Sequence, residues 1–232
     1  MPLHIGVVAC SAEGAALCYR TLCGEGESLL GPHGHPEVSM HTPPFAEYVV
    51  ALERSDLARV AELMLGSAQK LAAAGADFLI CPDNSIHQAF DLVAPRSPRP
   101  WLHIAEVVAE EARARGFRRV GLTGTCWLVD SEVYPEKLAA KGVECVRPSE
   151  PERAEVQRII MDELVRGRFE AKSIEALQRI VASLARRGAE AVVLGCTELP
   201  LVLDERTSPL PTLDSTRLLA RAALRRAVEG VK

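Results

Sequence analysis

Two stretches of the chain decide its fold. The first is LAAAGADFLICPDNS, residues 71–85, and the second is LARRGAEAVVLGCTE, residues 184–198. They align without a gap, and each consists of a helix end, a capping glycine, a short apolar strand and a polar loop. The alignment places Asp83 over Cys196. We therefore expect an internal repeat and two related lobes, each with one of these loops.

Short apolar runs alternate with helix-period stretches along the rest of the chain. The run IGVVACS, residues 5–11, aligns with VGLTGTC, residues 120–126, so the opening strands of the two lobes also match. This alternation predicts an α/β fold in which each lobe has a mainly parallel sheet flanked by helices. The expected strands are 4–9, 38–41, 77–81, 101–104, 119–123, 143–147 and 191–194. The expected helices are 56–74, 105–115, 151–167, 173–187 and 214–228.

The composition excludes several classes of protein. The chain has 232 residues, of which 48% are hydrophobic and 25% charged, as in globular proteins. A net charge of −4 and 4% aromatic residues provide neither a basic field nor a stacking platform, so we expect no nucleic-acid partner. The sequence has no apolar run of membrane-spanning length and no secretory signal pattern, so we expect no membrane partner and a cytoplasmic protein.

Metal and cofactor chemistry also find little support in the residue pattern. The seven cysteines are scattered without the paired spacing of a zinc site, and we expect them to be reduced. His33 and His35 form a short histidine pair without nearby carboxylates, which is typical of a turn. The five lysines do not follow a glycine-rich loop and make a Schiff-base lysine for pyridoxal less favoured. The prediction is a protein without metal or cofactor.

The two aligned loops indicate where chemistry takes place. Ligands of parallel α/β sheets bind outside the carboxyl ends of the strands, and both loops follow such a strand. If the lobes face each other, the Asp83 loop and the Cys196 loop approach one cleft from opposite sides. That arrangement suits acid–base chemistry on two faces of one carbon atom.

At this point the residues resemble a known family. LGCTELP, residues 194–200, is similar to the Gly-Cys-Thr-Glu signature of the cofactor-independent aspartate/glutamate racemase superfamily, and NSIH, residues 84–87, resembles its Cys-Asn-Thr-x-His motif. The resemblance spans nearly the whole chain. It implies two pseudo-symmetric Rossmann-like lobes with the active site between them, here 1–103 plus 209–232 and 104–208. It further implies an amino acid or related carboxylic acid as substrate, no cofactor and a homodimer.

The family implies a two-base mechanism, in which one side chain removes the α-proton and another delivers a proton to the opposite face. Typical members place a cysteine directly before the asparagine, whereas this chain has Asp83 there and Cys81 two residues earlier. We expect Asp83 and Cys196 to be the acid–base pair. With unperturbed pKa values of about 3.9 for Asp and about 8.5 for Cys, the pair rests as carboxylate and thiol, and the reversed form lies about 6 kcal/mol higher. Burial and backbone amides can narrow this gap.

Further residues are assigned to the substrate and to the loops. The expected substrate-binding residues are Ser11, Thr42, Asn84, Ser85, Thr125, Arg166, Thr197 and Glu198. We expect His87 to form hydrogen bonds behind the Asp83 loop and Cys81 to be the reserve base. The segment after the second strand, residues 41–48, lacks the arginine that relatives use for an acidic side chain, and Arg166 is the expected replacement.

Three alternatives remain open at this stage. Asp83 is also a suitable cap for its own turn, in which case Cys81 becomes the base. A malonate-type decarboxylase needs only a single cysteine, here Cys196. A protein that binds an amino acid without exchanging its α-proton is the third alternative.

Overall fold

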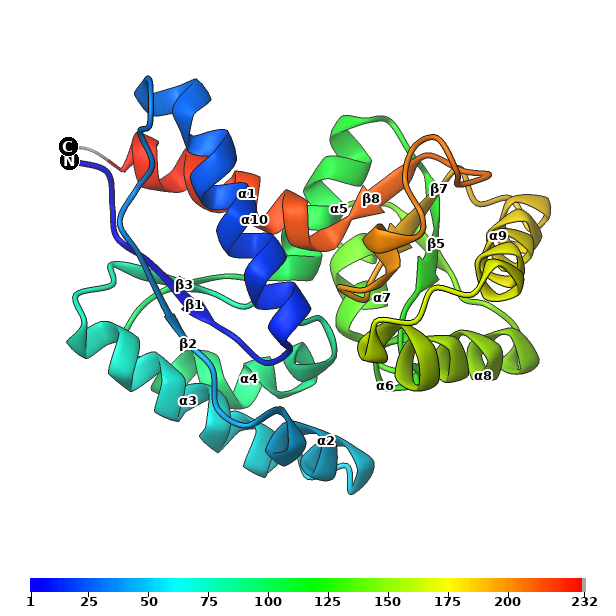
Figure 1. Cartoon of the computed structure of the whole chain (residues 1–232), viewed down its shortest axis with the longest axis horizontal. Coiled ribbons are helices and arrows are strands. Elements are labelled where there is room, and N and C mark those ends of the chain that lie inside the picture. Colours follow the sequence, from blue (N-terminus) through cyan, green and yellow to red (C-terminus); the bar gives the residue numbers. More distant parts are fainter. Residues whose placement is uncertain (231–232) are drawn as a thin grey trace. The chain divides into compact units, whose positions relative to one another are not determined.

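The computed structural model describes residues 1–230, which divide into two compact units. Unit 1 comprises Met1–Val107 and the C-terminal segment from Thr216, and unit 2 comprises Val108–Ser215. The chain passes from one unit to the other within helix α5 (Ile104–Ala114) and at the first residue of α10 (Ser215–Glu229). Each unit contains one four-stranded sheet, and helices flank it (Figure 1).

The sheet of unit 1 has the order β2-β1-β3-β4, and all neighbouring strands are parallel. Its strands are β1 (Ile5–Val8), β2 (Val38–His41), β3 (Phe78–Ile80) and β4 (Trp101–Leu102). Its helical segments are α1 (Ala12–Leu30), α2 (Phe45–Glu53), α3 (Leu57–Ala73), η1 (Ser85–Ala89), α4 (Phe90–Val93) and η2 (Ala94–Arg96). Side chains of α1, α10 and the start of α5 form one apolar cluster with β1 and β3, and α3 lies on the opposite side of the sheet (Figure 1). Strands β1 and β3 are buried along their whole length, as strands covered on both faces must be.

The sheet of unit 2 has the equivalent order β6-β5-β7-β8, again with parallel neighbours. Its strands are β5 (Arg119–Thr123), β6 (Glu144–Val146), β7 (Ala191–Leu194) and β8 (Thr212–Asp214). Its helical segments are α6 (Cys126–Val129), α7 (Val133–Ala139), α8 (Glu150–Arg158), η3 (Ile159–Glu163), η4 (Leu164–Arg166), α9 (Ala171–Arg186) and η5 (Leu199–Leu201). Its core joins α8 and α9 to β7. The expected α/β fold with two parallel-sheet lobes is confirmed.

The internal repeat extends to individual contacts within each unit. A Cβ atom added to Gly6 would lie 3.3 Å from the Leu71 Cβ, and one added to Gly121 would lie 3.2 Å from the Leu184 Cβ. These two glycine–leucine pairs are aligned in the repeat, so each glycine lets a helix approach the central strand of its sheet. The glycines that end the preceding helices, Gly75 and Gly188, both have positive φ, as the sequence predicts.

A second repeated contact joins the acidic residue before β3 to the start of β1, and the acidic residue before β7 to the start of β5. The Asp77 carboxylate accepts the backbone N–H of His4 at 2.7 Å, and the aligned Glu190 carboxylate accepts those of Arg118 and Arg119. The backbone N–H of the acidic residue donates in return to His4 O and to Arg119 O, in both cases at 2.8 Å. The repeat is therefore one of hydrogen bonds as well as of strand order.

The structure corrects two expectations. Strand β8 was not expected, and the predicted helix 151–167 is not continuous. Helix α8 ends at Arg158 and continues as a π-helical turn, Ile159–Glu163, in which the Arg158 guanidinium donates to the Glu163 carboxylate five residues later at 2.6 Å. A five-residue spacing matches the π-helical repeat, so this pair favours the wider turn.

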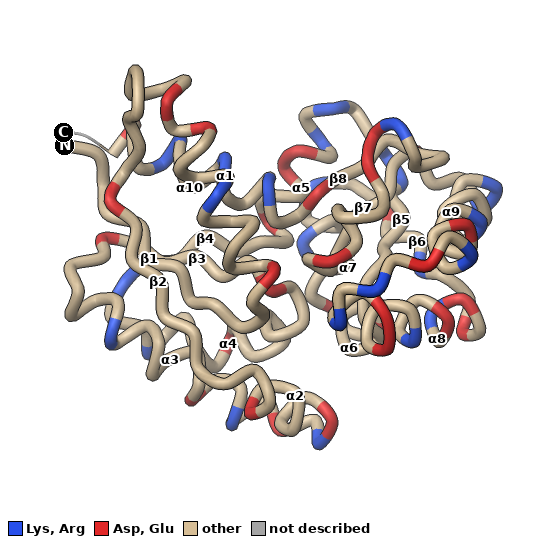
Figure 2. The backbone as a smooth tube through the Cα atoms, in the orientation of Figure 1, with Lys and Arg blue, Asp and Glu red and all other residues tan. Residues whose placement is uncertain are grey.

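Charged groups are distributed over both units. Figure 2 shows Lys and Arg interspersed with Asp and Glu along the helices. None of the helices within residues 1–230 combines the length and apolar character that a membrane span requires. Among the same residues, no group of three His, Cys, Asp or Glu side chains is arranged to hold a metal ion.

Candidate active-site loops

Asp83 lies in the loop that follows β3, at the carboxyl edge of the unit 1 sheet. Its Oδ2 atom accepts hydrogen bonds from the backbone N–H groups of Cys10 and Ser11, each at 3.2 Å. Those groups belong to the loop after β1, which lies beside β3 in the sheet. Two N–H donors stabilise a carboxylate relative to the neutral acid. These bonds reach 73 and 72 residues along the chain, so Asp83 joins two loops and does more than cap its own turn.

The remainder of this loop packs inward. Asn84 is buried and precedes η1, and the partly buried Ser85 is the first residue of η1. His87 is buried, donates from Nδ1 to the Asp83 carbonyl at 2.9 Å, and accepts the Ile104 backbone N–H at Nε2 at 3.5 Å. Because Nε2 accepts, the neutral ring carries its hydrogen on Nδ1. His87 thus connects the Asp83 loop to the start of α5.

Cys81 directly follows β3 and contacts the backbone of Asp83. Its side chain is fully buried, and its thiol donates to the Asp83 carbonyl at 3.6 Å. Burial, and after it the negative charge of Asp83, raise the pKa of Cys81 well above its usual value. Both effects oppose the thiolate that a reserve base needs at neutral pH.

Two other residues of unit 1 differ in their exposure. The expected ligand Thr42 is exposed just after β2. Tyr48 on α2 is fully buried, and its pKa is raised by burial and by the nearby Cys81, Cys10 and Asp83. This phenol therefore stays protonated among the groups that surround Asp83, and no residue pattern in the sequence had indicated it.

Cys196 lies at the matching position of unit 2, in the loop after β7. This loop requires Gly195, because a Cβ there would lie 2.5 Å from Leu128 Cδ2 and 2.6 Å from Thr123 O. Gly124, with φ of 155°, faces it, and a Cβ at Gly124 would lie 3.0 Å from Gly195 O. The loops after β5 and β7 are therefore in close backbone contact, which brings Thr125 and Cys196 to one edge of the sheet.

The Cys196 thiol is partly exposed and donates a hydrogen bond to Glu198 Oε2 at 2.9 Å. The hydroxyl of Thr197 donates to the same oxygen at 2.8 Å. Glu198 itself is only 3% exposed. The sequence motif thus becomes a compact cluster in which one buried carboxylate accepts two hydrogens.

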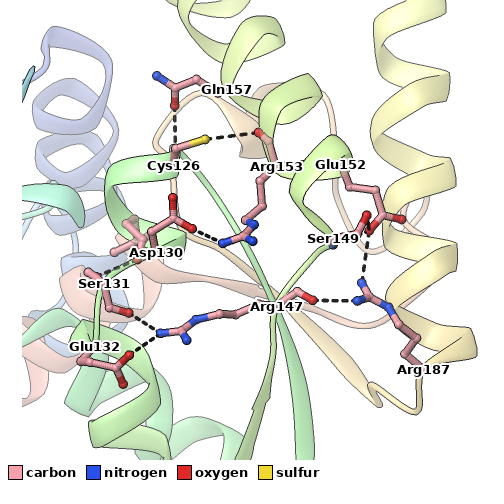
Figure 3. A network of polar contacts seen from close by, with 11 residues as sticks. Cys126, Asp130, Ser131, Glu132, Arg147, Ser149, Glu152, Arg153, Gln157 and Arg187 are labelled. Carbon is pink, nitrogen blue, oxygen red and sulfur yellow. Dashed lines mark hydrogen bonds and ion pairs between the residues drawn. The ribbon is translucent and has the colours of Figure 1, made fainter.

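The loop after β5 is held by a polar network (Figure 3). The Cys126 backbone N–H donates to the Gln157 side chain at 2.8 Å, and its thiol donates to the Arg153 carbonyl at 3.6 Å. Arg153 in turn pairs with Asp130. The network fixes α8 against the loop that contains the buried Thr125. Gln157 is a further positioning residue that sequence reasoning missed.

The arginines of unit 2 differ in their availability. Arg147 follows β6 and donates to Ser131 O at 2.6 Å and to Glu132 at 2.7 Å (Figure 3). Arg153 is paired with Asp130. Arg166, the predicted anchor for a carboxylate, is exposed at the end of η4, and no residue of the described chain pairs with its guanidinium. Arg166 is therefore the arginine of these three that is available to a ligand.

Within unit 1 the structure brings together Asp83, Ser11, His87 and Cys81, and within unit 2 it brings together Cys196, Thr197 and Glu198. The Cys10 backbone N–H, the second donor to Asp83, was not expected. No local residue pattern indicated it, because the pairing of β1 with β3 in the sheet places their loops side by side.

Comparison with known proteins adds the family. A model of the Asp/Glu/hydantoin racemase family matches residues 11–223, which is most of the chain. The chain belongs to the Asp/Glu/hydantoin racemase family. The expected resemblance is thereby confirmed, and with it the membership of a family of racemases.

Individual relatives agree with this assignment. The broad specificity amino-acid racemase RacX of Bacillus subtilis (strain 168) is 26% identical over 161 residues, which cover 69% of each chain. The crystal structure of an aspartate racemase homologue from Pyrococcus horikoshii OT3 has a TM-score of 0.83 and 29% identity, and covers 98% of this chain and 99% of its own. The crystal structure of a Yersinia pestis protein has a TM-score of 0.89 and 27% identity, with coverage of 97% and 99%.

Proposed function

We propose that the protein is a cofactor-independent amino acid racemase or epimerase that acts by two-base proton transfer at the α-carbon. Asp83 and Cys196 are the two acid–base groups, on opposite faces of the substrate. The proposal requires that the Asp83 loop and the Cys196 loop face one cleft between the units. The lobes of the proposal are units 1 and 2; the expected boundaries, 1–103 plus 209–232 and 104–208, lie four and seven residues before the crossings between the units.

One observation supports the proposal above the others. The groups at the aligned positions of the two repeats have complementary roles as acceptor and donor. Asp83 accepts hydrogen bonds from two backbone N–H groups, whereas Cys196 donates its thiol hydrogen. A base that is ready to accept and an acid that is ready to donate are the two requirements for inverting a stereocentre.

The remaining site residues are assigned to substrate binding. Inversion passes through a carbanion whose charge spreads onto the α-carboxylate, so hydrogen-bond donors around that group lower the barrier. Asn84, Ser85, Thr125 and Thr197 supply polar groups beside the two bases. Ser11 contributes through its backbone N–H to Asp83, and its hydroxyl caps α1 by accepting from Gly14 N–H at 3.2 Å. Thr42, exposed after β2, is also assigned to substrate binding.

The proposed substrates are free amino acids. Arg166 is the proposed partner for a substrate carboxylate, which keeps aspartate and glutamate among the substrates. The relative named as a broad specificity amino-acid racemase supports including neutral amino acids. The proposal also retains a cytoplasmic homodimer that needs no cofactor.

The test is proton NMR in deuterium oxide with a panel of L- and D-amino acids. We expect the α-proton signal of at least one amino acid to disappear, with formation of the opposite enantiomer measured on a chiral column. Loss of carbon dioxide from malonate-type acids without any amino acid exchange would instead identify a decarboxylase. Binding of an amino acid with its α-proton retained would identify a non-catalytic binding protein.

A further inference from the structure

The Cys196 cluster contains a buried carboxylate at a position where the other loop has no charged residue. Glu198 Oε2 accepts both the Cys196 thiol and the Thr197 hydroxyl, at 2.9 and 2.8 Å. In the internal repeat, Glu198 aligns with Ser85, which carries no charge. A negative charge beside a thiol disfavours the thiolate, and a carboxylate that accepts the S–H hydrogen adds to this preference.

The following inference rests on the proposed function. We infer that Glu198 is a positioning residue that keeps Cys196 protonated between turnovers. The free protein is therefore held with Asp83 as the base and Cys196 as the acid. The hydrogen bonds of both loops favour this resting distribution of protons. Backbone N–H groups of Cys10 and Ser11 favour the Asp83 carboxylate in unit 1, and Glu198 favours the Cys196 thiol in unit 2.

The resulting cycle balances. The substrate Cα–H bond breaks, its electron pair stays on the carbanion, and the proton forms an O–H bond with Asp83. The Cys196 S–H bond then breaks, its proton forms the new Cα–H bond on the opposite face, and the sulfur keeps the electron pair. The product leaves Asp83 neutral and Cys196 as a thiolate.

The reset step follows from the geometry of unit 2. The new thiolate lies against the Glu198 carboxylate, and like charges at such a distance repel each other. Water therefore supplies a proton to Cys196, and Asp83 releases its proton to water. The protein returns to its resting form through solvent, before the next substrate binds.

The inference is tested on the thiol itself, in the full-length protein. The rate of Cys196 alkylation by iodoacetamide is measured against pH, and peptide mass spectrometry separates Cys196 from the other cysteines. Glu198→Gln retains an oxygen acceptor and removes the charge. We expect it to lower the midpoint pH of Cys196 alkylation by about one unit or more. Glu198→Asp, which restores the charge, should return the midpoint toward the wild-type value.

Two controls accompany the measurement. Glu175→Gln removes one charge from the exposed surface of α9 and should leave the Cys196 midpoint unchanged. The alkylation profile of Cys126, which bonds to Arg153 O, should be the same in all variants. If Glu198→Gln is poorly folded, Glu198→Ala replaces it with the same expected direction. An unchanged Cys196 midpoint in folded, charge-removing variants overturns the inference.

A second measurement separates this inference from the proposed function. If Cys196 is the acid, the alkaline limb of the kcat/KM profile should move to lower pH in Glu198→Gln, by the same amount as the alkylation midpoint. A midpoint that moves while no amino acid exchanges its α-proton leaves the control of Cys196 by Glu198 intact and refutes the racemase proposal. If the alkaline limb of the kcat/KM profile moves while the midpoint of Cys196 alkylation does not, the role of Glu198 is refuted.

Discussion

The loops after β3 and β7 occupy equivalent places in two equivalent sheets, yet they hold their ionisable groups in opposite ways. Each loop has one carboxylate within three aligned positions, at the first position in Asp83-Asn84-Ser85 and at the third in Cys196-Thr197-Glu198. Asp83 accepts hydrogen bonds from the neighbouring loop, whereas Glu198 accepts them from its own loop. The negative charge thus lies at the proposed base in one loop and beside the proposed acid in the other.

The loops after β1 and β5 also differ in their hydrogen-bond partners. The Ser11 backbone N–H donates to Asp83, but the aligned N–H of Cys126 donates to the side chain of Gln157. Ala9 and Pro82 in unit 1 align with Gly124 and Gly195 in unit 2, where the two loop backbones come into close contact. The comparison teaches that the repeat preserves the backbone framework, while the hydrogen-bond partners determine the chemistry of each loop.

Removal of either proposed acid–base group should have the greatest effect. Cys196→Ala and Asp83→Asn should each lower the turnover of the best substrate by about 100-fold or more, since each deletes one proposed proton-transfer group. Chiral chromatography of the product measures the rate. Substantial activity in Cys196→Ala would refute the assignment of the acid, and unchanged turnover in Asp83→Asn would move the base to Cys81.

Asp83→Cys sharpens the same comparison. It places a thiol at both aligned positions, so the two acid–base groups become alike in intrinsic acidity. We expect this variant to racemise faster than Asp83→Asn. Equal rates in the two variants would show that position 83 needs a carboxylate in particular.

The next largest effect concerns the shared framework. In Gly6→Ala the new Cβ would lie 2.6 Å from Leu79 Cδ2 and 2.9 Å from the Ala76 Cβ, whereas in Gly121→Ala it would lie 2.9 Å from Leu184 Cδ1. We expect a loss of about 2–3 kcal/mol of unfolding free energy for Gly6→Ala and about 1 kcal/mol for Gly121→Ala, because the contacts in unit 1 are closer. Urea denaturation measures both.

Gly24→Ala is the matched control for these glycine variants. Gly24 lies within α1, and a Cβ there would meet no atom within 4 Å apart from its chain neighbours and the nearby backbone of its own helix. Since alanine is the better helix former, this variant should be at least as stable as the wild type, by up to about 1 kcal/mol. Equal losses in all three variants would show that contact distance does not determine the cost.

A smaller effect is expected at Cys81. Because its thiol is fully buried and its pKa is raised, Cys81→Ala should keep turnover within a few-fold of the wild type. It should lose about 1 kcal/mol of stability through the deleted buried atom. A loss of turnover as large as that of Asp83→Asn, with the fold retained, would make Cys81 the base.

The smallest effect is expected at Glu190, the acidic residue before β7. Backbone N–H donation from Arg118 and Arg119 lowers the pKa of Glu190. A folded pKa below the unfolded value means that the carboxylate stabilises the fold above about pH 4.3 and that this contribution is lost as the pH falls through the folded value. Glu190→Gln should therefore lower Tm at pH 7 less than the Gly6 and Gly121 substitutions do. The difference from wild type should shrink below about pH 4.

Thermal unfolding followed by circular dichroism between pH 3 and pH 7, values chosen to bracket the glutamate range of about 4.3, measures this dependence. Glu175→Gln, on the exposed surface of α9, is the control for the loss of one charge. A wild-type minus Glu190→Gln difference that is constant over this range would contradict the assignment.

Much of the fold was accessible from local patterns. The seven expected strands all exist, because buried parallel strands are continuous apolar runs between glycine-capped helices. Strand β8 was missed since Thr212–Asp214 is short and follows prolines, and it is defined by pairing with β7. No range was predicted for helix α1, in which Gly24 and Gly26 interrupt the apolar pattern. The Arg158–Glu163 pair spans the π-helical turn, which helix periodicity does not reveal.

The candidate site likewise has features that the sequence shows and features that depend on the fold. The identities and alignment of Asp83 and Cys196 follow from the repeat, because a gapless match needs only sequence. The donors to Asp83 and the partners of Cys126 come from segments distant in the chain, and the order of strands in the sheet brings them together.

The residue pattern alone indicates a duplicated α/β protein that resembles a racemase family, with a carboxyl group and a thiol at matching positions. The folded structure adds that Asp83 accepts backbone hydrogens and that Cys196 donates to a buried glutamate. The physical reason is that periodicity and glycine caps act between near neighbours, whereas the protonation of an ionisable group depends on the dipoles and charges that folding places around it.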